Sequence, residues 1–206
     1  MSYSGLILDF GGVVTTRFRT ALSGFCDREG LNPHQLHHVL RESPEGRAAL
    51  FEAESGKISQ REFERRLGPL LGVSDSDLTK RICADLHPCE PMLALIKRVR
   101  ETGVKTALLS NSWGTGGYDI YTGYDLPKYF DVVVVSDQVG CAKPDSAIYE
   151  LTIDKLGIPA SECIFADDVP RNLEPAQALG ITTVLVDDPA DAVNEIARLL
   201  DLRPEN

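Results

Sequence analysis

Short apolar runs that alternate with helical patterns are the feature that most limits what this chain can fold into. Five runs rich in Val, Ile and Leu end in polar or glycine-containing turns: LILDF (6–10), KTALLS (105–110), DVVVVS (131–136), CIFAD (163–167) and TTVLV (182–186). Such runs are typical of strands that are buried on both faces. Helical patterns that end at a glycine lie between them, at 92–103, 145–157 and 172–180. This alternation predicts an α/β fold with a parallel sheet.

Residues 17–87 break the alternation, because they contain amphipathic helical stretches and no convincing strand. In the stretch NPHQLHHVLRES, Asn32 suits the N-cap and Pro33 suits the first helical position. A boundary is expected at His87-Pro88, since the residue before a proline disfavours helix. We therefore predict a helical cap at 17–87, inserted after the first strand, and a discontinuous core made of 1–16 and 88–206.

Composition limits the classes of partner. The 206 residues carry 21 basic and 31 acidic side chains, a net charge of −10, which argues against a nucleic-acid or anionic-membrane partner. A small anionic substrate is still compatible, because a local metal or lysine can outweigh the overall charge. The five cysteines are scattered, and the N-terminus has no basic segment followed by a long apolar run. These features predict reduced thiols and a cytoplasmic protein, and the sequence gives no indication of an oligomeric state.

Polar residues follow the strands at the edge where open α/β sheets bind their ligands. Each one alone has an ordinary explanation as a turn, cap or solvated residue. Together they suit phosphoryl transfer through an aspartate, since a carboxylate nucleophile divides the displacement into two easier steps. Oxygen ligands suit Mg²⁺, and a lysine with hydroxyl and amide groups would neutralise the phosphoryl oxygens. The residues in question are Asp9, Ser110, Asn111, Lys143, Asp167 and Asp168.

Four motifs built on these residues resemble those of the haloacid dehalogenase-like hydrolases: DFGGVV (9–14), LLSNSW (108–113), AKP (142–144) and FADDVPRNLEPAQALG (165–180). The similarity is greatest to the branch that contains the phosphatase domain of soluble epoxide hydrolases and small sugar-phosphate phosphatases. The stretch GKISQREFERRL (56–67) also resembles the cap of that branch. The resemblance implies a Rossmann-like core and Mg²⁺-dependent hydrolysis of a small phosphorylated metabolite through an aspartyl-phosphate.

The resemblance also implies a role for each site residue. Asp9 would be the nucleophile, and Lys143 would bridge it to the phosphate. Asp9, the backbone carbonyl of Gly11 and Asp168 would bind Mg²⁺. Substrate would be contacted by Gly12, Ser110 and Asn111, and the metal ligands would be supported from behind by Asp167 and Asn172. Position in the chain, and not the resemblance, suggests Trp113 as a further substrate contact. Trp113 opens a tyrosine-rich segment (113–130) directly after Ser110-Asn111, and this segment either lines the substrate entrance or packs as an ordinary long loop against the core.

Gly11 departs from the family pattern, which commonly has an aspartate there as general acid/base. Such a group contributes about 10²–10⁴-fold to the rate. Three alternatives stay open: the substrate has an easily departing group, as in a sugar 1-phosphate or acyl phosphate; another residue or water supplies the proton; or catalysis is weakened, leaving a binding protein. A dehalogenase is a further alternative, although that reaction needs no metal and the pair Asp167-Asp168 therefore counts against it.

Overall fold

A five-stranded parallel sheet forms the centre of the computed structural model, which describes residues 3–114 and 116–202. The strand order is β3-β2-β1-β4-β5. The first predicted strand ends earlier than expected, because Asp9 and Phe10 already belong to the following turn. The other predicted strands agree to within a residue at each end. The observed strands are β1 (Gly5–Leu8), β2 (Lys105–Ser110), β3 (Val132–Val135), β4 (Cys163–Asp167) and β5 (Thr182–Leu185).

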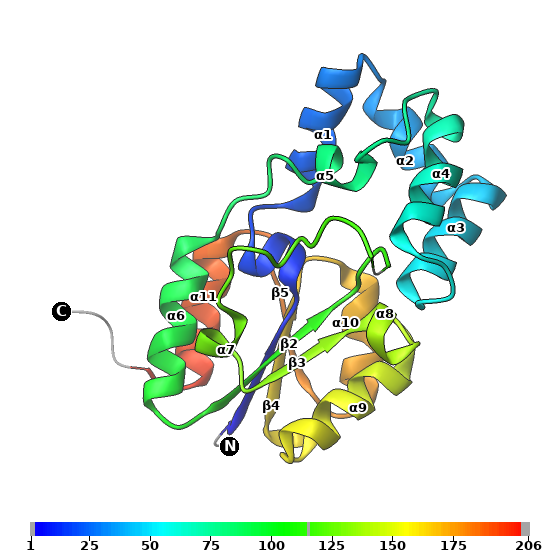
Figure 1. Cartoon of the computed structure of the whole chain (residues 1–206). Coiled ribbons are helices and arrows are strands. Elements are labelled where there is room, and N and C mark those ends of the chain that lie inside the picture. The colour runs from blue at the N-terminus through cyan, green and yellow to red at the C-terminus, as the bar shows by residue number, and fades with distance from the viewer. Residues whose placement is uncertain (1–2, 115, 203–206) are drawn as a thin grey trace.

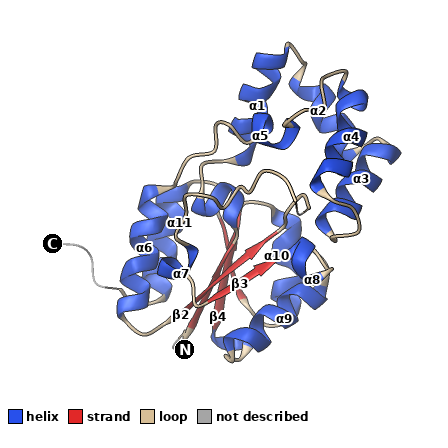
Figure 2. Ribbon diagram, viewed as in Figure 1, coloured by secondary structure: helices blue, strands red, loops and turns tan. Residues whose placement is uncertain are grey.

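Helices cover both faces of this sheet, as Figures 1 and 2 show. One face packs against α6 (Glu90–Glu101) and α11 (Pro189–Leu199), and the other packs against α9 (Ser146–Leu156) and α10 (Pro170–Ala178). Alternate residues of β1 therefore enter different cores: Leu6 and Leu8 face α6, whereas Ile7 faces α9 and α10. Short connecting helices complete the core: α7 (Leu126–Tyr129), α8 (Ser136–Val139) and the 3-10 helix η2 (Ala160–Glu162). The predicted α/β fold with a parallel sheet is thus confirmed.

Five helices between β1 and α6 gather beyond the carboxyl ends of the strands (Figure 1). They have a hydrophobic core of their own, which includes Phe25, Leu36 and Phe63. Asn32 accepts a hydrogen bond from the His34 N–H at 2.9 Å, so the predicted N-cap is confirmed. The helices are α1 (Phe18–Glu29), α2 (Pro33–Arg41), α3 (Pro44–Glu54), α4 (Gln60–Leu71) and α5 (Leu78–Ile82).

The chain leaves and re-enters the core along two adjacent segments. The Cys89 N–H donates to the Val14 carbonyl at 2.9 Å, and the Thr16 N–H donates to the His87 carbonyl at 2.7 Å. These bonds support the proposed division into a core of 1–16 and 88–206 and a cap of 17–87. Within the described ranges, no helix is both long and apolar enough to span a bilayer.

Candidate active site

The turn after β1 presents Asp9 at the carboxyl edge of the sheet. This residue is buried, and its Oδ1 accepts a hydrogen bond from the Phe10 N–H at 2.7 Å. The chain then forms a single wide turn, η1 (Phe10–Val14), in which Gly12 has a φ of 86°. A Cβ at Gly12 would lie 2.4 Å from Asp168 Oδ2, so both the backbone and the available space require glycine here.

Gly11 is not required by the geometry of the same turn. Its φ is −73°, which any residue can adopt. A Cβ at Gly11 would meet only the Phe18 side chain, at 3.8 Å and beyond. The departure from the family pattern at Gly11 is therefore a difference in chemistry, and the fold does not impose it.

Lys143 connects the carboxylates of two strands. Its side chain is almost fully buried, and Nζ lies 2.8 Å from Asp9 Oδ1 and 2.7 Å from Asp167 Oδ2. Asp167 also accepts from the Val169 N–H at 2.8 Å and from Asn172 Nδ2 at 3.1 Å on both oxygens. Asp167 is thus saturated by protein donors, and it fixes the lysine beside the nucleophile position.

Burial changes the acidity of the carboxylates at this edge. Burial is the main cause that raises the pKa of Asp9 to about 7; the charge of Lys143 opposes this change, and the charges of Asp167 and Asp168 add to it. Burial and the charge of Asp167 raise the pKa of Asp168 to about 6. Oxygen atoms of the three carboxylates lie within 4.8 Å of one another. Three negative charges held this close repel one another, so a bound divalent cation would stabilise the ionised form of the carboxylates.

The donor set fits such a cation. All three side chains offer oxygen, which Mg²⁺ prefers. Asn172 Oδ1 is buried without a hydrogen-bond partner in the described structure. Because buried acceptors are normally satisfied, this orphan oxygen is consistent with a group, such as a metal-bound water, that belongs to the complete site.

Ser110 and Asn111 lie at the end of β2, and their side chains make different contacts. The Tyr121 hydroxyl donates to Ser110 Oγ at 2.8 Å, and the Ser110 hydroxyl makes only a long bond, 3.4 Å, to the Asn111 carbonyl. The Lys143 N–H donates to Asn111 Oδ1 at 2.9 Å, and Asn111 Nδ2 donates to the Lys143 carbonyl at 3.0 Å. Asn111 therefore anchors the lysine loop to the sheet, and its side chain also hydrogen-bonds to Glu54 of the cap.

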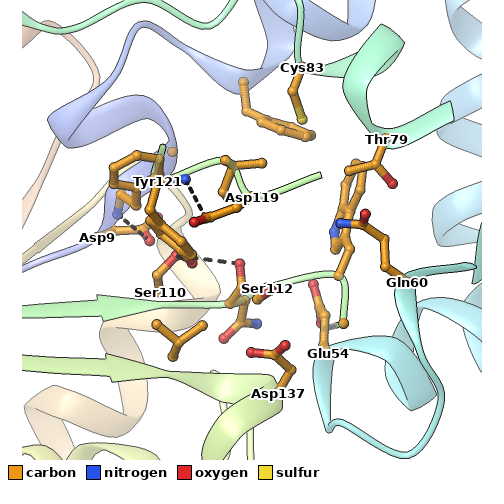
Figure 3. A pocket seen from close by; sticks show the side chains of 18 of the residues that line it. Asp9, Glu54, Gln60, Thr79, Cys83, Ser110, Ser112, Asp119, Tyr121 and Asp137 are labelled. Atoms are coloured by element: carbon orange, nitrogen blue, oxygen red, sulfur yellow. Dashed lines mark hydrogen bonds between the residues drawn. The ribbon is translucent and has the colours of Figure 1, made fainter. Parts of the chain in front are cut away.

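A pocket of about 480 Å³ extends from these residues to the cap. Trp113 lines it and contacts two aromatic rings of cap helices: it packs edge-on against Phe18, with ring centroids 5.1 Å apart, and at a tilt against Phe63, with ring centroids 5.4 Å apart. The predicted substrate contact is therefore also a contact between the cap and the core. On the cap side the pocket is lined by Glu54, which is labelled among the lining side chains in Figure 3, and burial raises the pKa of Glu54 to about 7.

The structure brings almost all of the predicted site residues to this single pocket. Gly12 does not line it: the residue is buried, and its N–H donates to Thr15 Oγ1 at 3.2 Å within its own turn. Asp167 lies fully buried behind the lining. Tyr121, Arg41 and Arg171 also line the pocket and were not predicted individually. The predicted residues in the lining are Asp9, Gly11, Ser110, Asn111, Trp113, Lys143, Asp168 and Asn172.

Comparison with known families agrees with this geometry. Residues 73–186 match the model of the family described as haloacid dehalogenase-like hydrolase, which is more than half of the chain. The protein belongs to this family and is a hydrolase, as the sequence motifs predict.

Similar proteins include an acyl-CoA dehydrogenase family member 10 from Mus musculus, 40% identical over 109 residues, which are 53% of this chain and 10% of the relative. Bifunctional epoxide hydrolase 2 from Rattus norvegicus is 34% identical over 113 residues, 53% of this chain and 20% of the relative. The matched segment thus spans a fifth or less of these relatives. A D-ribitol-5-phosphate phosphatase from Bacteroides thetaiotaomicron is 28% identical and is matched over 95% of this chain and 98% of its own length.

Solved structures share the fold. A predicted HAD-like family hydrolase from Porphyromonas gingivalis superposes with a TM-score of 0.75 and 24% identity over all of both chains. A HAD family enzyme from Bacteroides thetaiotaomicron, crystallised with magnesium and inorganic phosphate, gives a TM-score of 0.68 at 24% identity over 89% of this chain and 94% of that chain.

Proposed function

We propose that the protein is a Mg²⁺-dependent phosphatase that hydrolyses a small phosphorylated metabolite through an aspartyl-phosphate on Asp9. The observation that carries the proposal is the position of Asp9. Its carboxylate lies at the floor of a 480 Å³ pocket, 2.8 Å from a buried lysine and in a cluster of three carboxylates. The phosphatase names of several relatives support this reaction over dehalogenation.

The two oxygens of Asp9 have different roles in the proposed reaction. Oδ1 accepts from both the Phe10 N–H and Lys143, so Oδ2 keeps its lone pairs for attack on phosphorus. The bond from phosphorus to the leaving oxygen breaks as the bond to Asp9 forms. Water then attacks the phosphorus atom, which releases inorganic phosphate and restores the carboxylate.

The remaining groups neutralise the phosphoryl oxygens. Asp9, the Gly11 carbonyl and Asp168 would hold Mg²⁺, which would offset the negative charge of phosphate and carboxylates. The Ser110 hydroxyl and the Asn111 amide would donate to phosphoryl oxygens, which would take the place of the Asn111 carbonyl and of Glu54 as their acceptors. These donors are fixed before substrate binds, because Tyr121 and the Lys143 loop hold them.

Gly11 narrows the substrate class. With no carboxylic acid at this position, the leaving oxygen must depart without a proton or take one from another group. Substrates with easily departing groups, such as sugar 1-phosphates and acyl phosphates, fit this site better than simple alkyl esters.

Release of p-nitrophenol from p-nitrophenyl phosphate tests the proposal. We expect turnover with Mg²⁺ and its loss in excess chelator, restored when Mg²⁺ is added back. Chloride release from chloroacetate without added metal, in the absence of any phosphatase activity, would show instead that the protein is a dehalogenase.

A further inference from the structure

Two arginines face the pocket from opposite sides. Arg41 is the last residue of α2 in the cap, and Arg171 lies in the first turn of α10 in the core. Both line the pocket that contains Asp9, and both are exposed at its surface. Within the described residues, neither guanidinium forms a hydrogen bond or an ion pair within 4 Å. Lys143, in contrast, is fully engaged by Asp9 and Asp167.

The charge of the two arginines is only partly balanced. The two guanidiniums line the same two pockets. Partial burial lowers the pKa of Arg41, and the charge of Arg171 lowers it further. Glu54 is the acidic group that opposes this effect. Burial raises the pKa of Glu54 to about 7, so it is only partly ionised near neutral pH. This part of the pocket therefore has a local excess of positive charge.

The arginine pair does not hold the carboxylates of the reaction centre. Lys143 pairs with Asp9 and Asp167, and among the described residues neither arginine forms an ion pair with these acids. The reacting phosphoryl group already has a lysine, a hydroxyl, an amide and the expected cation as partners. A second pocket next to the first shares Arg41, Glu54, Lys143 and Arg171 as lining, so the pair lies where the two hollows meet.

We propose that Arg41 and Arg171 bind a second anionic group of the substrate, a carboxylate or a second phosphate. Guanidinium groups bind either anion through two parallel hydrogen bonds. The proposal rests on the phosphatase function above and names its substrate class as small phosphomonoesters that carry another acidic group. Because one arginine belongs to the cap and the other to the core, binding of this group would also hold the cap against the core.

Three aryl phosphates test this directly, because they share a leaving group and differ only in the distal substituent. They are 4-(carboxymethyl)phenyl, 4-(phosphonomethyl)phenyl and 4-(2-hydroxyethyl)phenyl phosphate. We expect kcat/KM to be about tenfold higher or more for an anionic ester than for the neutral one. The larger of the two gains identifies carboxylate or phosphate as the recognised group.

Variants assign the preference to the pair. Arg41→Gln and Arg171→Gln should lose the preference while keeping the kcat/KM of the neutral ester. Arg19→Gln is the matched control, since Arg19 is an exposed cap arginine in α1 that lines neither pocket, and it should keep the preference.

Several results would overturn the inference. One is an equal kcat/KM for the anionic and neutral esters, and another is a preference for the anionic esters that survives in both variants. A third is an equal loss of activity toward all three esters in the variants, because this loss would assign the arginines to the reacting phosphate. Hydrolysis of p-nitrophenyl phosphate without hydrolysis of either anionic ester would also overturn it. If no ester at all is hydrolysed, including p-nitrophenyl phosphate, the proposed function itself fails.

Discussion

Placing an aspartate at Gly11 should restore a proton donor to the site. The residue has a φ of −73°, and the nearest atoms to a Cβ there belong to the Phe18 side chain at 3.8 and 3.9 Å. Gly11 also lines the pocket, so the new carboxyl group would stand where substrate enters. The backbone at this position can therefore accommodate the aspartate of Gly11→Asp without strain. Gly11→Asn is a control, because its side chain has the same size but lacks the acidic group.

The expected gain depends on the leaving group. A positioned acid contributes about 10²–10⁴-fold, and the low end corresponds to about 2.7 kcal/mol of transition-state stabilisation. Glycerol phosphate needs a proton on its leaving oxygen, so its kcat/KM should rise about 100-fold in Gly11→Asp. For p-nitrophenyl phosphate the leaving group departs without a proton, and kcat/KM should change by no more than a few-fold.

The assay is kcat/KM across a series of phosphate esters of increasing leaving-group pKa. The unmodified protein should show a steep decline along the series, and Gly11→Asp should show a shallower one. If kcat/KM of the unmodified protein does not depend on leaving-group pKa, and phosphoryl transfer is rate-limiting, another acid already donates the proton to the leaving oxygen. An equal gain in Gly11→Asn would refute the reasoning as well.

Three further predictions test separate parts of the account. Asp168→Ala should raise the Mg²⁺ concentration for half-maximal activity about tenfold or more; an unchanged requirement would remove Asp168 from the metal site. Gly12→Ala should lower the free energy of unfolding by about 1–3 kcal/mol in urea, because of its positive φ and the 2.4 Å approach to Asp168, whereas Gly11→Ala should change it by less than about 1 kcal/mol. Glu54 has a pKa raised from 4.5 to about 7, so its ionisation destabilises the folded state as pH rises through this range. Glu54→Gln should therefore be more stable than the unmodified protein by about 1–3 kcal/mol at pH 8 and lose this advantage by pH 4; a constant difference at both pH values would contradict the assigned environment.

The sequence predicted the sheet and most of the site for one physical reason. Strands buried on both faces are continuous apolar runs, and a parallel sheet brings their carboxyl ends to one edge. The residues after three such runs, Asp9, Ser110 and Asp168, could therefore be grouped before any contact was known. The strand end at Leu8 was placed two residues late, because the apolar pattern continues through Phe10 while the backbone already turns.

The cap side of the site could not be predicted in the same way. Arg41 and Glu54 reach the pocket only because the cap helices pack over the strand ends, and no local pattern encodes that placement. Asn111 was predicted to bind phosphate, yet most of its amide anchors the Lys143 loop. Tyr121 belongs to the tyrosine-rich segment after Trp113, where position in the chain indicates proximity but not its hydrogen bond to Ser110.

The most direct test of the central claim is the turnover of Asp9→Asn with p-nitrophenyl phosphate and Mg²⁺. An amide has the size of the carboxylate but cannot attack phosphorus, so the account predicts no detectable turnover in a variant that keeps the circular dichroism spectrum of the unmodified protein. Near-unmodified turnover by Asp9→Asn would contradict the aspartyl-phosphate mechanism.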